Sequence, residues 1–310
     1  MTDKNRRPPI DKLPPELVRR LSPRRRELIR PVLDHPRDFV LLSVRKLAAA
    51  IGSDAMTVLR TIRGMGFEGY PEFRHYLHEL ALVQTTQIDL MQGGLARDSD
   101  VPERLRTTLA HDSSNLAALR HGLDFGRLQA VAARLYEARR IVLIAGDVAS
   151  VLVEFLQYNL AVIDLPAIAC TRTGDVAHAV RSLQRTDLVI AFTFRRGLRQ
   201  TVEGLQQARA RGAYCVAITD THLSPLARFA HEYFIIPVEG TVYGVSYVAP
   251  MAFLNVLLAA CAATRRARTL RLLKAADVEQ RTGFRWYRDG DLPDATAPAA
   301  ASRRPPRRKG

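Results

Sequence analysis

The sequence predicts a multidomain fold in which an all-α domain with a helix-turn-helix precedes a three-layer α/β domain built on a parallel five-stranded sheet. Three observations lead to this prediction. Apolar residues recur at helical spacing over residues 22–83, and a glycine separates two short amphipathic segments within 43–63. From residue 141 onward, short β-branched runs alternate with helical segments, as in βαβ units. Between these regions, residues 84–100 lose strong periodicity and contain a glycine pair, which indicates a linker or a helix end plus a linker. We draw the linker over 84–105, although helical spacing resumes near Val101 and continues to about Arg120.

The two ends of the chain lack the composition of a packed core. Residues 1–21 contain four prolines and several arginines, so we expect a flexible basic arm. Residues 285–310 are polar and end in a run of Ala, Pro and Arg, so we expect a disordered basic tail. The helix-turn-helix domain is therefore expected at 22–83 and the α/β domain at 106–284.

The net charge of +15 is concentrated toward the two ends. Residues 1–80 carry 16 Lys and Arg against 10 Asp and Glu, and residues 264–310 carry 13 against 5. Residues 81–263 carry 17 against 16 and are nearly neutral. Basic regions beside a neutral domain suit a polyanion such as DNA, because neutralising phosphates releases counterions. The alternative is that an Arg-rich composition merely produces basic surfaces, and charge alone leaves both explanations open.

Composition also excludes several classes of protein. Hydrophobic residues at 47% and charged residues at 25% are typical of a soluble globular protein. The longest apolar stretch, residues 249–263, contains Asn255 and is better explained as a core helix than as a membrane span. The three cysteines lie in apolar runs without a C-x-x-C pair, which argues against a disulfide framework or a zinc site. We therefore expect a cytoplasmic protein with no membrane partner, no metal and no cofactor.

Residues 43–63 carry the pattern of two crossing helices. Ser43 caps the first helix, Gly52 supplies the turn, and Asp54 caps the second helix. The first helix has one apolar face, made by Val44, Leu47, Ala48 and Ile51. The second is expected to bury Ala55, Val58, Leu59 and Ile62 and to expose Met56, Thr57, Arg60, Thr61 and Arg63.

The exposed face of this second helix suits the DNA major groove. Arg60 can pair with guanine or clamp a phosphate, Thr57 can contact a base edge or a phosphate, and Met56 can reach a thymine methyl. The predicted DNA-binding residues are Ser43, Arg45, Lys46, Asp54, Met56, Thr57, Arg60, Thr61 and Arg63. A generic αα-hairpin with a solvated charged face remains the alternative for the local pattern.

The surrounding residues resemble the RpiR family of bacterial regulators. The stretch 66–73, Gly-Phe-Glu-Gly-Tyr-Pro-Glu-Phe, is similar to an element that the family carries directly after its helix-turn-helix. Leu21-Ser22-Pro23 with Glu27, then Asp34-His35-Pro36, then the segment 43–48, also resemble the family's N-terminal domain. Met56 departs from the family, which usually has a smaller residue there. The resemblance covers residues 21–80 and implies a DNA-binding function.

The C-terminal half is expected to contain five strands, at 141–145, 165–169, 188–193, 214–219 and 233–237. A glycine-containing turn, 145–150, follows the first strand, and ligands bind at such carboxyl ends of parallel strands. One glycine alone is no dinucleotide fingerprint.

The order of elements over residues 120–265 resembles a sugar isomerase (SIS) domain, which RpiR regulators carry after their helix-turn-helix. Family members that bind sugar phosphates have a Gly-x-Gly-x-Ser turn and a Ser-x-Ser-Gly-x-Thr loop, whose hydroxyls and N–H groups hold the phosphate. This chain keeps Gly146 and Ser150 of the turn, but Val148 replaces the second glycine. In the loop, Thr193 keeps a hydroxyl at the first position. The second serine, the glycine and the threonine are replaced by Arg195, Arg196 and Leu198.

The altered loop predicts a small anionic effector. Two arginines, Arg195 and Arg196, in a partly desolvated cleft are unfavourable when unpaired, and an anion would relieve that cost. The predicted effector-binding residues are Gly146, Ser150, Thr193, Arg195 and Arg196. The alternative is that the arginines lie at the surface or in an oligomer interface.

Few residues suggest catalysis. An isomerase needs a positioned base, for which His222 and Glu239 are candidates, and Asp220 and His222 follow a strand and are candidate pocket residues. We therefore expect no enzyme, but a transcription regulator that binds double-stranded operator DNA as a dimer or tetramer and responds to a small-molecule effector, a sugar phosphate or another anionic metabolite. The alternatives are a sugar-phosphate isomerase with an appended helical domain, and a DNA-binding structural protein whose α/β domain only oligomerises.

Overall fold

The computed structural model describes residues 21–84, 88, 100–195, 197–240 and 244–282. The predicted basic tail, nearly all of the predicted N-terminal arm and Arg196 lie outside the described residues. Leu21, which the sequence placed in the arm, is buried in the core of the helical domain.

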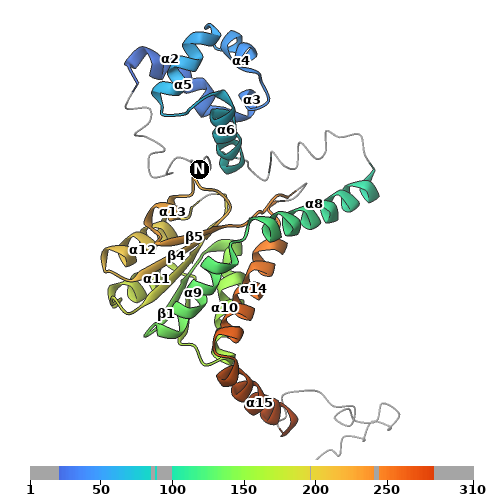
Figure 1. Ribbon diagram of the computed structural model, residues 1–310, viewed down its shortest axis with the longest axis vertical. Coiled ribbons are helices and arrows are strands. Elements are labelled where there is room, and N and C mark those ends of the chain that lie inside the picture. The colour runs from blue at the N-terminus through green and yellow to red at the C-terminus, as the bar shows by residue number, and fades with distance from the viewer. Residues whose placement is uncertain (1–20, 85–87, 89–99, 196, 241–243, 283–310) are drawn as a thin grey trace, which may run out of the picture.

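The N-terminal domain contains the helices α2 (Pro23–Asp34), α3 (Pro36–Phe39), α4 (Val44–Ala50), α5 (Ala55–Gly64) and α6 (Tyr70–Gln84) (Figure 1). The apolar faces of these helices meet in one core that includes Ile29, Leu47 and Ile62. Aromatic side chains close the core, and the Phe67 and Phe73 rings lie edge to face with their centroids 5.4 Å apart. The helical spacing of residues 22–83 thus produced a packed all-α domain.

Local signals define the crossing of α4 and α5. The Ser43 hydroxyl accepts a hydrogen bond from the Lys46 N–H, and the Asp54 carboxylate accepts one from the Thr57 N–H. Gly52 has a φ of 66°, a left-handed conformation that favours glycine, and it ends α4 with a sharp turn. Both caps and the turn predicted from the sequence are confirmed.

The helix α8 (Val101–Gly122) begins where the sequence predicts that helical spacing resumes, near Val101. Asp100 caps it by accepting a hydrogen bond from the Glu103 N–H. The linker drawn over 84–105 therefore includes the first five residues of this helix. The C-terminal half of α8 buries Asn115 and Leu119 against the α/β domain.

The five strands are β1 (Ile141–Ile144), β2 (Ala167–Cys170), β3 (Leu188–Phe192), β4 (Tyr214–Thr219) and β5 (Glu232–Ile235). They form one parallel sheet in the order β2-β1-β3-β4-β5, and Val142 pairs with Ile168 on one side and with Val189 on the other. The strands β2 and β3, which follow one another along the chain, lie on opposite sides of β1. The direction in which strands are added to the sheet therefore reverses between β1 and β3. Ligands bind at such switch points, outside the carboxyl ends of the strands.

Helices cover both faces of the sheet and make three layers (Figure 1). The helices α9 (Phe125–Glu137), α10 (Ser150–Val162) and α14 (Val248–Thr264) pack on one face. The helices α11 (Thr173–Arg181), α12 (Arg199–Ala210) and α13 (Pro225–Phe229) pack on the other. Along β1, Ile141 and Leu143 point to the first core and Val142 and Ile144 to the second, as a strand buried on both faces requires.

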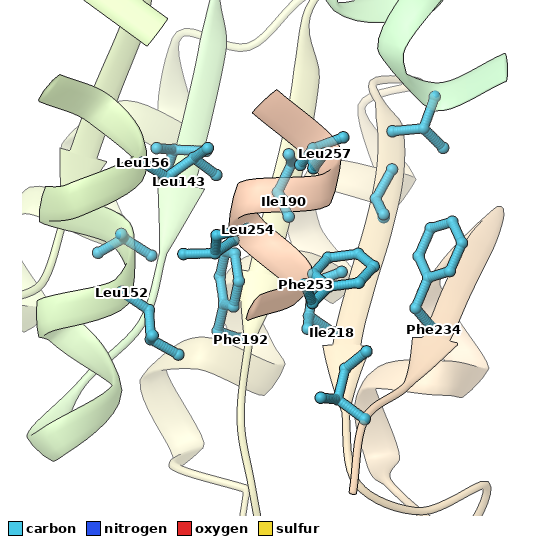
Figure 2. Close-up of a cluster of buried hydrophobic side chains, with 14 of the residues drawn as sticks. Leu143, Leu152, Leu156, Ile190, Phe192, Ile218, Phe234, Phe253, Leu254 and Leu257 are labelled. Carbon is cyan, nitrogen blue, oxygen red and sulfur yellow. The ribbon is translucent and has the colours of Figure 1, made fainter. Parts of the chain in front are cut away.

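Figure 2 shows the first core, where Phe253, Leu254 and Leu257 of α14 lie against Phe192 and neighbouring strand residues. This packing explains the apolar run 249–263 as a buried helix. Within the described residues, no single helix is both long and apolar enough to span a membrane. In the described part of the chain, one bent pair has the length and composition of a span: α14 and residues 266–279 of α15 (Arg266–Thr282), which meet at 107°.

Candidate functional site

The exposed face of α5 carries part of the predicted DNA-binding set. Met56, Arg60 and Arg63 are all exposed, and their spacing of four and three residues places them on one stripe of the helix. The exposed residues Ser43, Arg45 and Lys46 lie at the start of α4. The structure therefore presents these cationic side chains to solvent on the two helices that cross at Gly52.

Thr61 corrects the prediction for α5. It was expected on the exposed face, but its exposure is 0% and its hydroxyl donates to the Thr57 carbonyl at 2.8 Å. The buried stripe is Val58, Thr61, Ile62 and Met65, at i, i+3, i+4 and i+7. A threonine tolerates this position because its hydroxyl bonds to the preceding turn. Thr61 consequently cannot contact DNA without disrupting the core.

Asp54 and Thr57 form a local unit at the start of α5. The Thr57 N–H and hydroxyl both donate to the Asp54 carboxylate, at 2.8 and 2.6 Å. The hydroxyl, and then the backbone N–H, hold the pKa of Asp54 below its usual value of 3.8. The Thr57 hydroxyl proton is thus directed to Asp54, which leaves the hydroxyl oxygen as an acceptor for a base or a water molecule.

The predicted effector residues lie at the carboxyl ends of β1 and β3, which are adjacent strands. Gly146 follows β1, and a Cβ there would lie 2.6 Å from Leu198 and 2.9 Å from Gln200. A larger residue at this position would therefore displace the ends of these two side chains, which belong to the segment after β3. Ser150 begins α10, and its hydroxyl donates to the Asp147 carbonyl at 2.7 Å.

Two residues at this edge adopt the left-handed conformation that glycine favours. Asp147 after β1 has a φ of 51°, and Arg195 after β3 has a φ of 62°. Such conformations are unfavourable for residues with a Cβ and gather at binding and catalytic sites. Their occurrence on neighbouring strands supports this edge of the sheet as the functional one.

Arg195 is surrounded by carboxylates. Its backbone N–H donates to both oxygens of Asp220, at 3.0 and 3.1 Å. Its guanidinium lies 3.9 Å from the Asp220 carboxylate and 3.6 Å from that of Glu239. The side chain is only 9% exposed, so these contacts neutralise a nearly buried cation. The expectation of an unpaired Arg195 is therefore wrong, and Arg196 lies outside the described residues.

Burial changes the acid–base properties of this group. It raises the pKa of Asp220 above 3.8, although the Arg195 N–H and guanidinium act in the opposite direction. Burial, together with the Asp220 and Asp147 carboxylates, raises the pKa of Tyr247 to about 12. The carboxylates that follow β1 and β4 thus both act on the Tyr247 hydroxyl. The Tyr247 ring packs edge to face on Phe194, with the ring centroids 5.7 Å apart.

Sequence reasoning found some of these residues and missed others. It named Asp220 and Glu239 as candidates, but their contact with Arg195 bridges 25 and 44 positions of sequence. Tyr247 and Asp147 were missed. Asp147 lies in the glycine-containing turn, where a signal existed, whereas nothing near Tyr247 in the sequence marks it. Thr193 is buried at the end of β3, where its N–H donates to the Ile218 carbonyl.

Comparisons with known proteins agree with both domains. Residues 134–260 match the SIS domain family. An HTH-type transcriptional regulator of Caldanaerobacter subterraneus subsp. tengcongensis is 22% identical over 69% of this chain and 75% of its own. The HTH-type transcriptional regulator HexR of Pseudomonas aeruginosa is 27% identical over 67% of this chain and 72% of its own.

Solved structures share the fold. The sugar isomerase domain of the RpiR transcription factor from Sphaerobacter thermophilus is 25% identical, with a TM-score of 0.54 over 58% of this chain and 99% of that one. The Vibrio vulnificus NanR protein, solved with ManNAc-6P, is 21% identical, with a TM-score of 0.58 over 86% of this chain and 99% of that one. An alignment of 86% has to include residues of both the helical and the α/β domain.

Proposed function

We propose a DNA-binding function regulated by a metabolite for this chain, which belongs to the RpiR family of helix-turn-helix transcription regulators with a SIS domain. The observation that carries the proposal is the exposed stripe of Met56, Arg60 and Arg63 on α5. Such a stripe on the second helix of a helix-turn-helix fits the major groove. Ser43, Arg45 and Lys46 on α4 are proposed to contact the phosphate backbone.

The proposed readout can be tested with DNA selected by the protein itself. Full-length protein would be used to select a binding sequence from a random duplex library, and the dissociation constant would then be measured for variants. Arg60→Ala and Thr57→Ala should each weaken binding by about 1–3 kcal/mol if the lost contact is to a base edge. Arg106→Ala is the matched control, because Arg106 is an exposed arginine on α8 outside the helix-turn-helix. Unchanged binding by both α5 variants would refute the assignment.

For the effector, we propose a sugar phosphate or another small anion at the ends of β1 and β3. The site residues are Gly146, Ser150, Thr193, Arg195 and Arg196. ManNAc-6P is the first compound to test, because it is the ligand solved with the structurally similar NanR. Arg195 is held by Asp220 and Glu239, so an anion that engages its guanidinium has to replace a carboxylate. Calorimetry with a panel of sugar phosphates, on wild type and Arg195→Ala, tests this; equal binding by both would exclude Arg195.

We also propose that the chain associates with itself. Helix-turn-helix proteins bind symmetric operators as dimers, so a second copy is required for two half-sites. Val101, Leu105 and Leu109 are 63%, 63% and 68% exposed and share one face of α8. An apolar stripe of this kind suits a second copy of the chain. Sedimentation of Leu105→Glu beside wild type tests the role of α8: an unchanged oligomeric state would place the interface elsewhere.

The alternative of a sugar-phosphate isomerase is less well supported. The relatives are named as transcriptional regulators. Glu239, one of the two candidate bases, forms an ion pair with Arg195, which ties its carboxylate to that side chain. Turnover of aldose and ketose phosphates would demonstrate the enzyme directly. Action on DNA implies a cytoplasmic location, which fractionation of cells that express the protein would test.

A further inference from the structure

The loop after β4 contacts the candidate effector site at one end and the helical domain at the other. We call residues 220–223 the coupling loop. At its start, Asp220 accepts the Arg195 N–H and lies beside the Arg195 guanidinium. The next residue, Thr221, is buried, and its hydroxyl donates to the Glu79 carboxylate of α6 at 3.1 Å. Two adjacent residues therefore join two domains.

The Thr221 hydroxyl both donates and accepts a hydrogen bond. While it donates to Glu79, its oxygen accepts the Leu223 N–H at 3.1 Å. The Ser224 N–H donates to the Thr221 carbonyl at 3.2 Å, and the Ser224 hydroxyl caps α13. These hydrogen bonds fix the loop to the start of α13. A displacement of Asp220 is therefore expected to move Thr221 as well.

The helical domain receives the loop with a second contact. Leu223 packs against the core of that domain, the cluster that contains Phe73 and Tyr76 of α6. The positive charge of Arg228, on α13, lowers the pKa of Tyr76, while burial raises it to about 12. Figure 1 shows α6 extending toward α13, in agreement with these contacts.

Glu79 in turn is held from both sides. One carboxylate oxygen accepts from Thr221, and the other lies 3.4 Å from Nε2 of His75 on the preceding turn of α6. Through α6 the contact reaches the DNA-facing helix, because Phe73 of α6 and Ile62 of α5 share one core. Closely packed elements of this kind move between discrete arrangements rather than deforming continuously.

We propose that the coupling loop transmits occupancy of the effector site to the helix-turn-helix, with Asp220 and Thr221 as its positioning residues. This rests on the proposed function. An anion that engages the Arg195 guanidinium draws it away from Asp220, and the Asp220 carboxylate then changes its contacts. Because Thr221 follows directly, the hydrogen bond to Glu79 is altered, and with it the position of α6. An effector regulates only through such a difference between two states.

Backbone hydrogen exchange of the full-length chain tests the link without DNA or effector. Thr221→Val removes the hydroxyl and should speed exchange of the α6 amides by about fivefold, the equivalent of one hydrogen bond of about 1 kcal/mol. Asp220→Asn removes the charge beside Arg195 and should also speed α6 exchange. Thr107→Val is the matched control, because the hydroxyl of Thr107 donates to the Glu103 carbonyl of its own helix, α8, and its loss removes no bond between the described parts of the two domains. It should leave α6 unchanged.

Two further measurements keep the proposal falsifiable. The Asp220→Asn/Thr221→Val double variant should exchange at α6 no faster than Thr221→Val, because both changes act through one contact. Coupling is reciprocal, so Thr221→Val should also speed exchange of the Arg195 amide while the amides of β1 stay protected. Additive effects at α6, or an Arg195 amide that exchanges as in wild type, would overturn the link. Neither outcome depends on DNA binding, so a failure of the proposed function would be seen separately.

Discussion

Phe73→Ala should destabilise the helical domain while the stability of the α/β domain stays unchanged. Phe73 has 0% exposure and lies edge to face with Phe67 in a core built by α2 and α4–α6. Truncation of a fully buried phenylalanine costs about 3–5 kcal/mol, because apolar contacts are lost and a cavity remains. The domain, residues 21–84, is expected to have a free energy of unfolding of only about 3–10 kcal/mol at about 0.05–0.15 kcal/mol per residue.

The truncation therefore removes about 30% or more of the free energy of unfolding of this domain. Urea unfolding followed by hydrogen exchange separates the two domains, since peptides from α5 and α6 report on one and peptides from β1 and β3 on the other. We expect the first set to lose protection at lower urea and the second set to keep its midpoint. DNA binding should fall in parallel, because α5 no longer has a scaffold.

Phe125→Ala is the matched control, because Phe125 is 57% exposed and its truncation leaves no cavity. It should shift neither domain by more than about 0.5 kcal/mol. The reasoning is refuted if Phe73→Ala costs the helical domain less than about 1 kcal/mol. It is also refuted if the β1 and β3 peptides lose protection at the same urea concentration, because the two domains would then unfold as one unit.

Three other predictions concern charge and reactivity. Burial raises the pKa of Asp220, so protonation of its carboxyl stabilises the folded state below pH 3.8, and this stabilisation is lost as the pH rises through the folded pKa. Wild type should therefore gain stability relative to Asp220→Asn as the pH falls from 7 to 3.5. A constant difference in the free energy of unfolding would contradict this. Burial raises the pKa of Cys170 to about 11 and of Cys215 and Cys261 to about 12, so iodoacetamide at pH 8 should modify them only after denaturation, as intact mass would report. Deletion of residues 295–310, which carry five basic and no acidic residues, should weaken binding to all DNA alike and flatten its salt dependence, by up to about 0.9 in slope for each lost phosphate contact; an unchanged slope would assign the tail another role.

Local chemistry in the sequence was sufficient for the elements and their order. Ser43 and Asp54 were identified as caps because their side chains bond to N–H groups three residues away, a contact that needs no tertiary structure. Gly52 was identified as the turn because a left-handed residue there favours glycine. The alternation of short β-branched runs with helices determined a parallel sheet, and with it the edge at which Gly146 and Thr193 lie.

Only the tertiary structure decided which face of α5 is buried and how Arg195 is neutralised. Two overlapping stripes of α5 have the i, i+3, i+4, i+7 spacing, and the packing of Met65 selected the one that includes Thr61. The carboxylates around Arg195 come from segments after β4 and β5, and the contact from Thr221 to Glu79 spans 142 positions. Sequence periodicity reports a residue's neighbours within one element, whereas these contacts depend on how the elements pack against one another.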